Sequence, residues 1–259
     1  MEGKKNIQLV LRPLLFMMLI SIISAPLYAY EVDSQIGQPL PATLIIDQPG
    51  NYILVNNITV STSRTYGIEI RSNDVTLDLH GYTLSGPGGS GIGIYVSQKD
   101  NVDIINGTVQ GFSCGISLSG TNHQVSNVRA YNNSSCGIKA ESSIINHCRA
   151  NSNGSEGIKA DSSTIINCTA NSNGSQGLRV SSSTITNCVA SSNGSHGLYA
   201  VNKCRLERNT LIGNGGYGLY LDPDYSYAIN NTAISNAAGN LYQSGTHYLP
   251  VSGSEANSE

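Results

Sequence analysis

The chain has 259 residues, a formal net charge of −3 and only 12% charged residues. It contains no tryptophan and two phenylalanines, which excludes a large aromatic core. The near-neutral charge offers no electrostatic basis for binding nucleic acid.

Residues 1–29 have the features of a secretory signal peptide. A basic start precedes an apolar run from Leu14 to Ile23, and Ala29 is the expected last residue before cleavage. The apolar run is shorter than the roughly 20 residues that cross a bilayer. We therefore predict an exported protein, periplasmic or extracellular, with no transmembrane segment after removal of the signal.

Residues 30–60 lack a regular period, and short strands are expected at Thr43–Ile46 and Tyr52–Val55. We predict that they form an N-terminal cap and a first irregular coil, because the end of a repeat array otherwise exposes apolar interior and an unpaired strand edge. At the other end, residues 246–259 have little to bury and are predicted to be a flexible tail.

Residues 61–245 repeat with a period close to 20 residues in the central part. Each repeat has short β-branched runs separated by Asn, Ser and Gly, and none has a helical pattern. A Gly-Ile or Gly-Leu pair such as Gly137-Ile138 marks each coil, with Asn240 replacing glycine in the ninth copy, as expected for a left-handed turn position. The pattern predicts an all-β parallel β-helix of about eight to nine coils, stacked about 4.8 Å apart.

The segment from Asn73 to Gly86 resembles the opening coil of many bacterial members of the pectate-lyase-like superfamily. The Asn-x-x-x-Gly-(Ile/Leu) coils are similar to those of its carbohydrate-associated and copper-accessory branches. The resemblance covers Leu44 to about Tyr242 and implies a secreted, right-handed, single-stranded parallel β-helix. It implies no particular activity, since the superfamily includes lyases, hydrolases, epimerases, adhesins and proteins of no known reaction.

The cysteines occupy two columns of the predicted helix. Cys148, Cys168 and Cys188 share one column and are interpreted as small buried residues packed on one another. Cys114 and Cys136 share another column on adjacent coils, within the range for a disulfide, and are the best candidates for one. Metal binding by the thiolates is not favoured, because the usual Cys-x-x-Cys spacing is absent.

Asparagines also recur in columns and are interpreted as structural ladders, in which stacked amides hydrogen-bond to their neighbours. One ladder contains Asn153, Asn173, Asn193, Asn214 and Asn236. A second contains Asn127, Asn167 and Asn187, with His147 in the fourth place. His196 stands alone and is interpreted as a variable turn residue.

A column of basic residues that point outward on consecutive coils is the first candidate site. Its members are Lys139, Lys159 and Arg179, followed in the same column by Tyr199 and Tyr220. Glu141 and Asp161 lie on the same outer face, so diagonal charge pairing and solvation would explain the column without a ligand. Alternatively, the column lines a groove for an acidic polysaccharide, with tyrosines stacking on sugar rings.

A second candidate lies on the opening coil. Asp74, Asp78 and His80 are expected to share one outer strand face, beside Asp103 of the next coil. Paired carboxylates with a histidine serve glycoside hydrolysis or bind Ca²⁺, but any half-buried strand shows the same alternation. Near the other end, Asp222-Pro223-Asp224 is similar to the Asp-Pro-His-Asp motif of alginate epimerases, but the histidine is missing.

Two functions from different classes remain. We favour a non-catalytic exported module that binds a polysaccharide or cell-surface glycan, for adhesion or in the envelope, because no long loops interrupt the coils. The alternative is a polysaccharide lyase or related enzyme acting on an acidic polysaccharide through one of the two charged faces. We expect a monomer with no metal or cofactor, except for Ca²⁺ in the case of a lyase.

Overall fold

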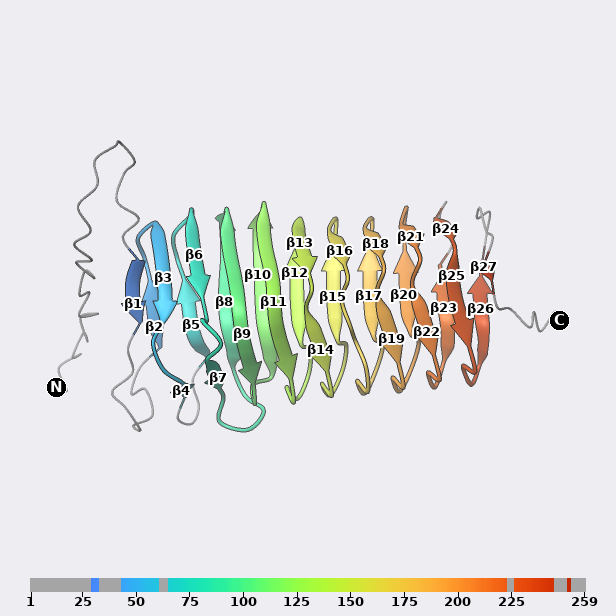
Figure 1. Ribbon diagram of the computed structural model, residues 1–259, viewed down its shortest axis with the longest axis horizontal. Coiled ribbons are helices and arrows are strands. Elements are labelled where there is room, and N and C mark those ends of the chain that lie inside the picture. Colours follow the sequence, from blue (N-terminus) through green and yellow to red (C-terminus); the bar gives the residue numbers. More distant parts are fainter. Residues whose placement is uncertain (1–28, 33–42, 61–64, 223–225, 245–250, 253–259) are drawn as a thin grey trace, which may run out of the picture.

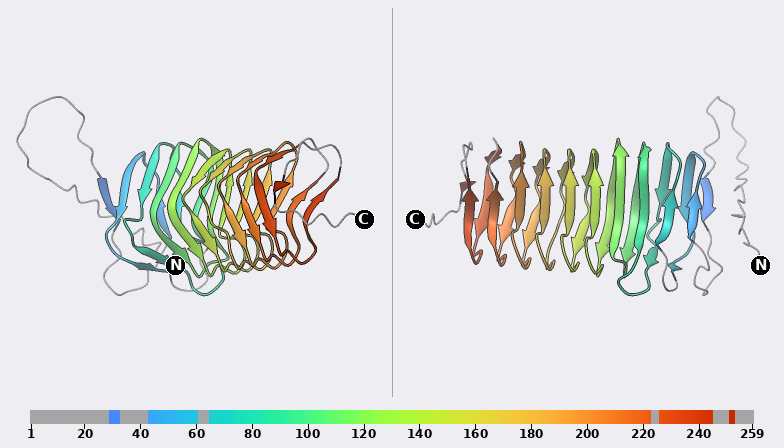
Figure 2. Two further views of the ribbon diagram at one scale, coloured as in Figure 1. Left: turned by 45° about the vertical axis from the view of Figure 1, so that its right-hand side comes forward. Right: turned by 180° about the vertical axis from the view of Figure 1, so that it is seen from behind.

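The computed structural model describes residues 29–32, 43–60, 65–222, 226–244 and 251–252. Every regular element in these residues is a strand, and the strands wind into a parallel β-solenoid of about nine turns, which confirms the predicted fold class. The coils stack along one axis, with β1 and β26 at opposite ends (Figures 1 and 2). The described part of the chain has no helix with the length and apolar character needed to cross a membrane.

A parallel sheet of ten strands forms one side of the solenoid. Its strands, in order, are β2 (Leu44–Ile46), β5 (Tyr66–Ile70), β8 (Ile92–Asp100), β10 (Cys114–Thr121), β12 (Ile138–Glu141), β15 (Ile158–Asp161), β17 (Leu178–Ser181), β20 (Leu198–Val201), β23 (Tyr217–Leu221) and β26 (Gly239–Gln243). We call it the ten-stranded sheet.

Two further sheets complete the coils. The larger contains β1 (Ala29–Val32), β3 (Gly50–Leu54), β6 (Val75–Asp78), β9 (Val102–Gln110), β11 (His123–Tyr131), β13 (Ser143–Asn146), β16 (Thr164–Ile166), β18 (Thr184–Thr186), β21 (Arg205–Glu207) and β24 (Tyr227–Ile229), with β4 (Ile58–Thr59), β7 (Thr83–Ser85) and β14 (Arg149–Asn151) paired beside this path. The smaller contains β19 (Val189–Ser191), β22 (Thr210–Ile212), β25 (Asn231–Ile234) and β27 (Val251–Ser252).

Aliphatic side chains alternate inward along the short strands and fill a narrow core. In one central coil, Ile138, Ala140, Ile145, Cys148 and Ala150 are all exposed by 1% or less. Equivalent positions of the neighbouring coils carry similar residues in register, so each side chain packs on its copy above and below. Burial of these stacked columns removes apolar surface from water along the whole solenoid.

Each central coil turns at corners where a polar residue has a left-handed backbone. In one coil these residues are Ser142, His147 and Ser152, with φ of 45°, 52° and 55°. Ser, Asn and His therefore take the positive φ that we had assigned to the glycine of the Gly-Ile pair. That prediction is wrong, since neither Gly157 nor Asn240 has a positive φ.

The marker glycine is required by the close approach of neighbouring coils. A Cβ atom on Gly157 would lie 2.6 Å from Nδ2 of Asn173 and 2.7 Å from the carbonyl oxygen of Gly177, both closer than a real Cβ tolerates. The glycine thus lets the asparagine ladder and the next coil pack directly against the backbone.

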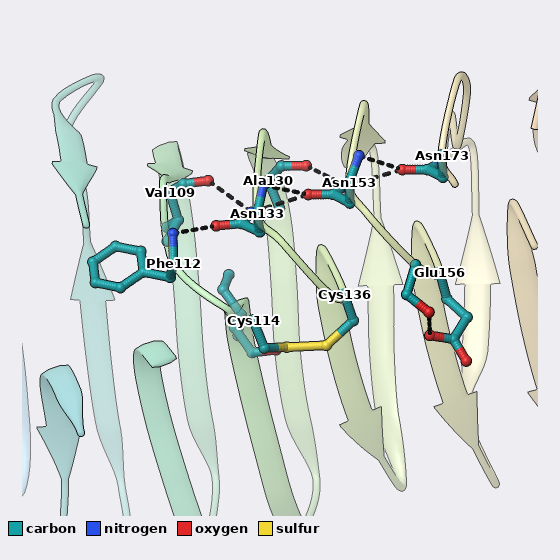
Figure 3. Close-up of a disulfide and its surroundings, with 11 residues drawn as sticks. Val109, Phe112, Cys114, Ala130, Asn133, Cys136, Asn153, Glu156 and Asn173 are labelled. Carbon is teal, nitrogen blue, oxygen red and sulfur yellow. Dashed lines mark hydrogen bonds between the residues drawn. A yellow bond between two sulfur atoms is a disulfide. The ribbon is translucent and has the colours of Figure 1, made fainter. Parts of the chain in front are cut away.

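The asparagine ladder lies inside the corner before the ten-stranded sheet (Figure 3). Nδ2 of Asn153 donates hydrogen bonds to Oδ1 of Asn173, over 3.0 Å, and to the carbonyl oxygen of Ala130, over 3.1 Å. Its Oδ1 accepts from the backbone and side-chain nitrogens of Asn133. These bonds provide partners for buried polar groups at a corner that the hydrogen bonds between strands do not reach.

The two cysteine columns differ. Cys114 and Cys136 form a disulfide between adjacent coils, with their Cα atoms 4.7 Å apart (Figure 3). Cys148, Cys168 and Cys188 are free and buried. Hydrogen bonds to the neighbouring thiols, and then burial, raise the pKa of Cys168 and Cys188, so both thiols stay protonated at neutral pH.

The ends of the solenoid add strands beyond the repeats. In the predicted cap, β2, β3 and β4 pair in register with β5, β6 and β7, so this segment already makes a coil. β1 begins at Ala29 and pairs with β3, and the rest of the predicted signal peptide lies outside the described residues. Within the predicted tail, β27 pairs with β25 through Val251, and the remainder of that tail lies outside the described residues.

Candidate functional site

One column on the outer face of the ten-stranded sheet joins cations to tyrosines. Strand register places its members directly beside one another in consecutive strands. They are Lys139, Lys159, Arg179, Tyr199, Tyr220 and Tyr242, which we call the cation–tyrosine column. The structure thus brings together the five residues predicted for this column and adds Tyr242. All six side chains are partly exposed.

The cations of this column lack the diagonal ion pairs that the sequence suggested. Among the described residues, no carboxylate oxygen lies within 4.0 Å of a side-chain nitrogen of Lys139, Lys159 or Arg179. Residues two apart on one strand have Cα atoms about 6.6 Å apart, and diagonal neighbours on adjacent strands are about 7–8 Å apart, so an ion pair requires both side chains to bend toward each other. Arg71 does so toward Glu69, over 2.7 Å, but the cation–tyrosine column does not.

Carboxylates flank the cations on both sides. Glu141 and Asp161 follow them along β12 and β15, and Glu156 lies just before β15, where it accepts a hydrogen bond from Ser155 over 2.7 Å. Three carboxylates therefore stand beside the three cations. This part of the face offers donors and acceptors without net charge.

The tyrosines form a continuous aromatic surface. The ring centroids of Tyr199 and Tyr220 are 5.0 Å apart, and those of Tyr220 and Tyr242 are 4.4 Å apart. Tyr217 lies beside them, 5.3 Å from Tyr242. The guanidinium carbon of Arg179 is 6.0 Å from the centre of the Tyr199 ring, which joins the cationic and aromatic parts of the column.

Tyr199 is also tied to an acidic residue. Its hydroxyl donates a hydrogen bond to Oδ2 of Asp222 over 3.1 Å. Burial, and then this hydrogen bond, raise the pKa of Tyr199, so its phenol stays protonated at neutral pH. The other two residues of the Asp-Pro-Asp motif lie outside the described part of the chain.

His196 lies among these rings, although the sequence suggested a variable turn residue. Its ring centre is 4.6 Å from that of Tyr220 and 5.8 Å from that of Tyr199. Nδ1 of His196 accepts a hydrogen bond from the backbone nitrogen of Tyr217 over 2.9 Å. A backbone N–H can only donate, which assigns the hydrogen of the neutral imidazole to Nε2.

The repeat pattern could have predicted the position of His196 beside the cation–tyrosine column. His196 occupies the same repeat position as Glu156 and Gln176, and Tyr217 occupies it in the next coil. This column runs directly beside the cation–tyrosine column. We define the tyrosine cluster as His196, Tyr199, Tyr217, Tyr220 and Tyr242.

A second aromatic pair lies at the other end of the same face. The rings of Tyr66 and Tyr95 stack at a centroid distance of 4.1 Å and an interplanar angle of 3°. Tyr95 pairs with Ser117, which in turn pairs with Lys139, so Tyr95 belongs to the same outward column as the cations. The repeat alone does not reveal this pair, because Tyr66 and Tyr95 occupy different positions of the repeat.

The acidic candidate on the opening coil is not brought together. Asp74 and His80 have φ of 57° and 48° and stand at the corners on either side of β6, so the prediction that they share its outer face with Asp78 is wrong. Oδ1 of Asp78 accepts the backbone N–H of His80 over 2.7 Å, and Oδ1 of Asp74 accepts from Asn101 over 2.7 Å. These carboxylates stabilise corners. Asp103 lies on the adjacent strand β9.

No metal site arises from these groups. In the part of the chain that the structure describes, no three side chains among His, Cys, Asp and Glu are close enough together to hold a metal ion.

Comparisons with known proteins define the fold. A family model described as "Right handed beta helix region" matches residues 42–205 and again residues 92–237. No curated protein matches the sequence. Among solved structures, the Dettilon tailspike protein (gp208) is similar with a TM-score of 0.64 and 14% identity over 79% of this chain and 47% of that one. This chain therefore spans about half the length of the tailspike.

Two enzymes have related structures. Pectate lyase Pel9A has a TM-score of 0.51 and 14% identity, covering 88% of this chain and 68% of its own. The periplasmic alginate epimerase AlgG has a TM-score of 0.54 and 12% identity, covering 80% of this chain and 69% of its own. At such identities the likeness concerns the fold alone.

Proposed function

Because the chain belongs to the right-handed β-helix family, whose coils align side chains into exposed columns, we propose that the ten-stranded sheet binds a glycan without altering it. The observation that carries the proposal is the direct continuation of Lys139, Lys159 and Arg179, which have no ion pair among the described residues, into the tyrosine cluster. Proteins of related fold include ones named for pectate and for alginate, both polysaccharides, which supports this class of ligand.

The chemistry of the face suits a sugar chain. Tyrosine presents an apolar ring to the face of a sugar and a hydroxyl to its edge. The cations donate hydrogen bonds to sugar oxygens, and the flanking carboxylates accept them from sugar hydroxyls. Charged groups that are not paired with each other remain available for such bonds.

The protonation states of His196 and Tyr199 support binding rather than catalysis. A lyase needs a base that takes a proton from carbon, and general bases work best with a pKa near the working pH. Nδ1 of His196 is occupied by a backbone N–H, and burial lowers the pKa of this histidine. The phenol of Tyr199 is protonated and already donates to Asp222.

A polysaccharide lyase is the second candidate. It is favoured by the position of Arg179 next to Tyr199, where a cation would neutralise a sugar carboxylate beside a phenol that donates a proton.

We also propose that the protein acts outside the cytoplasm, as a signal peptide implies, and the Cys114–Cys136 disulfide is in keeping with an oxidising compartment.

A glycan array with a parallel cleavage assay tests the proposal. We expect binding by the purified protein with no new unsaturated ends on pectate or alginate. Lys159→Ala and Tyr220→Ala should each weaken binding about fivefold to tenfold. Tyr227→Ala is the matched control, because Tyr227 is exposed on a different sheet, where it contacts Arg205. Cleavage that is lost in Lys159→Ala would establish the lyase instead.

A further inference from the structure

We propose that the ligand is an uncharged glycan chain that is long enough to contact two aromatic platforms at once. The inference rests on the proposed function and specifies its ligand. The N-terminal platform is the stacked pair Tyr66 and Tyr95, and the C-terminal platform is the tyrosine cluster. Both lie on the outer face of the ten-stranded sheet.

The two platforms are aligned along the solenoid axis. From Tyr95 the outward column passes through Ser117 and the three cations to Tyr199, which makes five steps between paired strands. At about 4.8 Å for each step, the platforms are roughly 24 Å apart. A chain lying along the column would therefore contact aromatic rings at both ends and polar groups between them.

The spacing sets a minimum length for the ligand. A six-membered sugar ring in an extended chain advances by about the distance between neighbouring strands. About six rings are then needed to reach from Tyr95 to Tyr199. Ser117, the smallest side chain of the column between the platforms, leaves the path of the chain open beside the first cation.

Charge balance decides between an uncharged and an acidic chain. The charges of Lys139, Lys159 and Arg179 are matched by those of Glu141, Glu156 and Asp161. At the N-terminal platform, Arg71 neutralises Glu69 over 2.7 Å, and at the other end Asp222 adds a negative charge.

The face therefore has no positive field to attract a polyanion, and the whole chain has a net charge of −3. Sugar hydroxyls, which both donate and accept hydrogen bonds, find partners of both kinds. The charge balance thus points away from the acidic polysaccharide that the cations alone suggested.

Calorimetry with oligosaccharides of defined length tests the inference. The probes are linear glucose, mannose and galactose oligomers of three and seven rings, and oligogalacturonates of the same lengths. We expect an uncharged seven-ring chain to bind at least tenfold more tightly than its three-ring counterpart. Its affinity should change little between low and high salt, because no net charge is neutralised.

Variants at the two platforms test whether a seven-ring chain contacts both platforms and a three-ring chain only one. Tyr95→Ala should weaken seven-ring binding about fivefold to tenfold and leave three-ring binding unchanged, whereas Tyr220→Ala should weaken both. Tyr95→Phe retains the ring and should bind seven-ring chains more tightly than Tyr95→Ala does. Tyr227→Ala controls for loss of a tyrosine elsewhere. Thermal unfolding of each variant confirms that the solenoid is intact.

Three results would overturn the inference while leaving the proposed function in place. They are equal affinity for three and seven rings, no effect of Tyr95→Ala on long chains, and tighter, salt-dependent binding of oligogalacturonate. Binding of none of the probes by the unchanged protein would overturn the inference alone, whereas the absence of any binding on the glycan array would overturn the proposed function as well.

Discussion

The backbone nitrogen of Tyr217 donates a hydrogen bond to Nδ1 of His196 in the preceding coil, over 2.9 Å. This bond fixes the orientation of the imidazole against the rings of Tyr199 and Tyr220. The single N–H of the neutral ring is then on Nε2. The neutral imidazole is therefore a hydrogen-bond donor at Nε2 and not a base at Nδ1, which fits the proposed binding face better than a lyase site.

We expect His196 to be a neutral Nε2–H tautomer at pH 7, with a pKa below its ordinary value of 6.5, because burial disfavours the charged imidazolium. Nitrogen-15 NMR of the imidazoles across a pH titration measures both properties. His147, whose ring is exposed, provides the comparison within the same protein. A resonance typical of protonated Nδ1 at pH 7 would contradict this assignment and favour the lyase over the binding module.

Acid should destabilise the protein through His123. This side chain is 1% exposed, its Nδ1 accepts the backbone N–H of Val102 over 3.3 Å, and burial lowers its pKa. The unfolded chain therefore binds the proton at a higher pH than the folded chain. The contribution of neutral His123 to the free energy of unfolding is fully present above about pH 6.5. It is lost as the pH falls below that value toward the pKa of His123 in the folded protein.

His123→Ser should reduce this acid sensitivity. Serine occupies the equivalent position in the next coils, where Oγ of Ser163 accepts the backbone N–H of Ser143 over 3.1 Å. Urea unfolding at pH 7.5 and pH 5 measures the effect, and we expect a smaller loss of unfolding free energy in the variant. An equal loss in both proteins would show that other groups control the acid response.

Removing one member of the asparagine ladder should be costly. Nδ2 of Asn173 donates to Ala150 and Asn193, and its Oδ1 accepts twice from Asn153. Asn173→Ala leaves several of these buried groups without partners, so we expect a loss of about 3 kcal/mol in unfolding free energy.

Gln124→Ala removes an exposed amide on β11 and should change that free energy by less than about 0.5 kcal/mol. Urea unfolding of both variants makes the comparison. Similar small losses in the two variants would mean that water replaces the missing amide inside the corner.

The disulfide should stabilise the solenoid by restricting the unfolded chain. Cys114 and Cys136 are separated by 22 residues, for which the entropy of loop closure corresponds to about 3 kcal/mol. Reductant should therefore lower the unfolding free energy by up to that amount. The double variant Cys114→Ser/Cys136→Ser should be insensitive, because the remaining four cysteines are free thiols. An unchanged unfolding midpoint in reductant would refute this role.

Much of the architecture could be predicted because a repeat places the same position of successive copies on neighbouring strands. That rule is enough to put Ile138 above Ile158, to align the cations in one column and to bring Cys114 beside Cys136. It fails where a residue's role depends on backbone conformation. The rule cannot tell that Asp74 stands at a left-handed corner, or that Gly157 serves close packing rather than a turn.

The sequence by itself determined the all-β solenoid, its repeat and the columns of residues on its faces, since periodicity alone decides which residues stack. Only the tertiary structure decided what the columns do. The absence of an ion pair between Lys159 and any described carboxylate, the orientation of His196 and the alignment of Tyr95 with Tyr199 depend on side-chain direction and on distances between coils. These quantities follow from packing in three dimensions, and a one-dimensional repeat does not contain them.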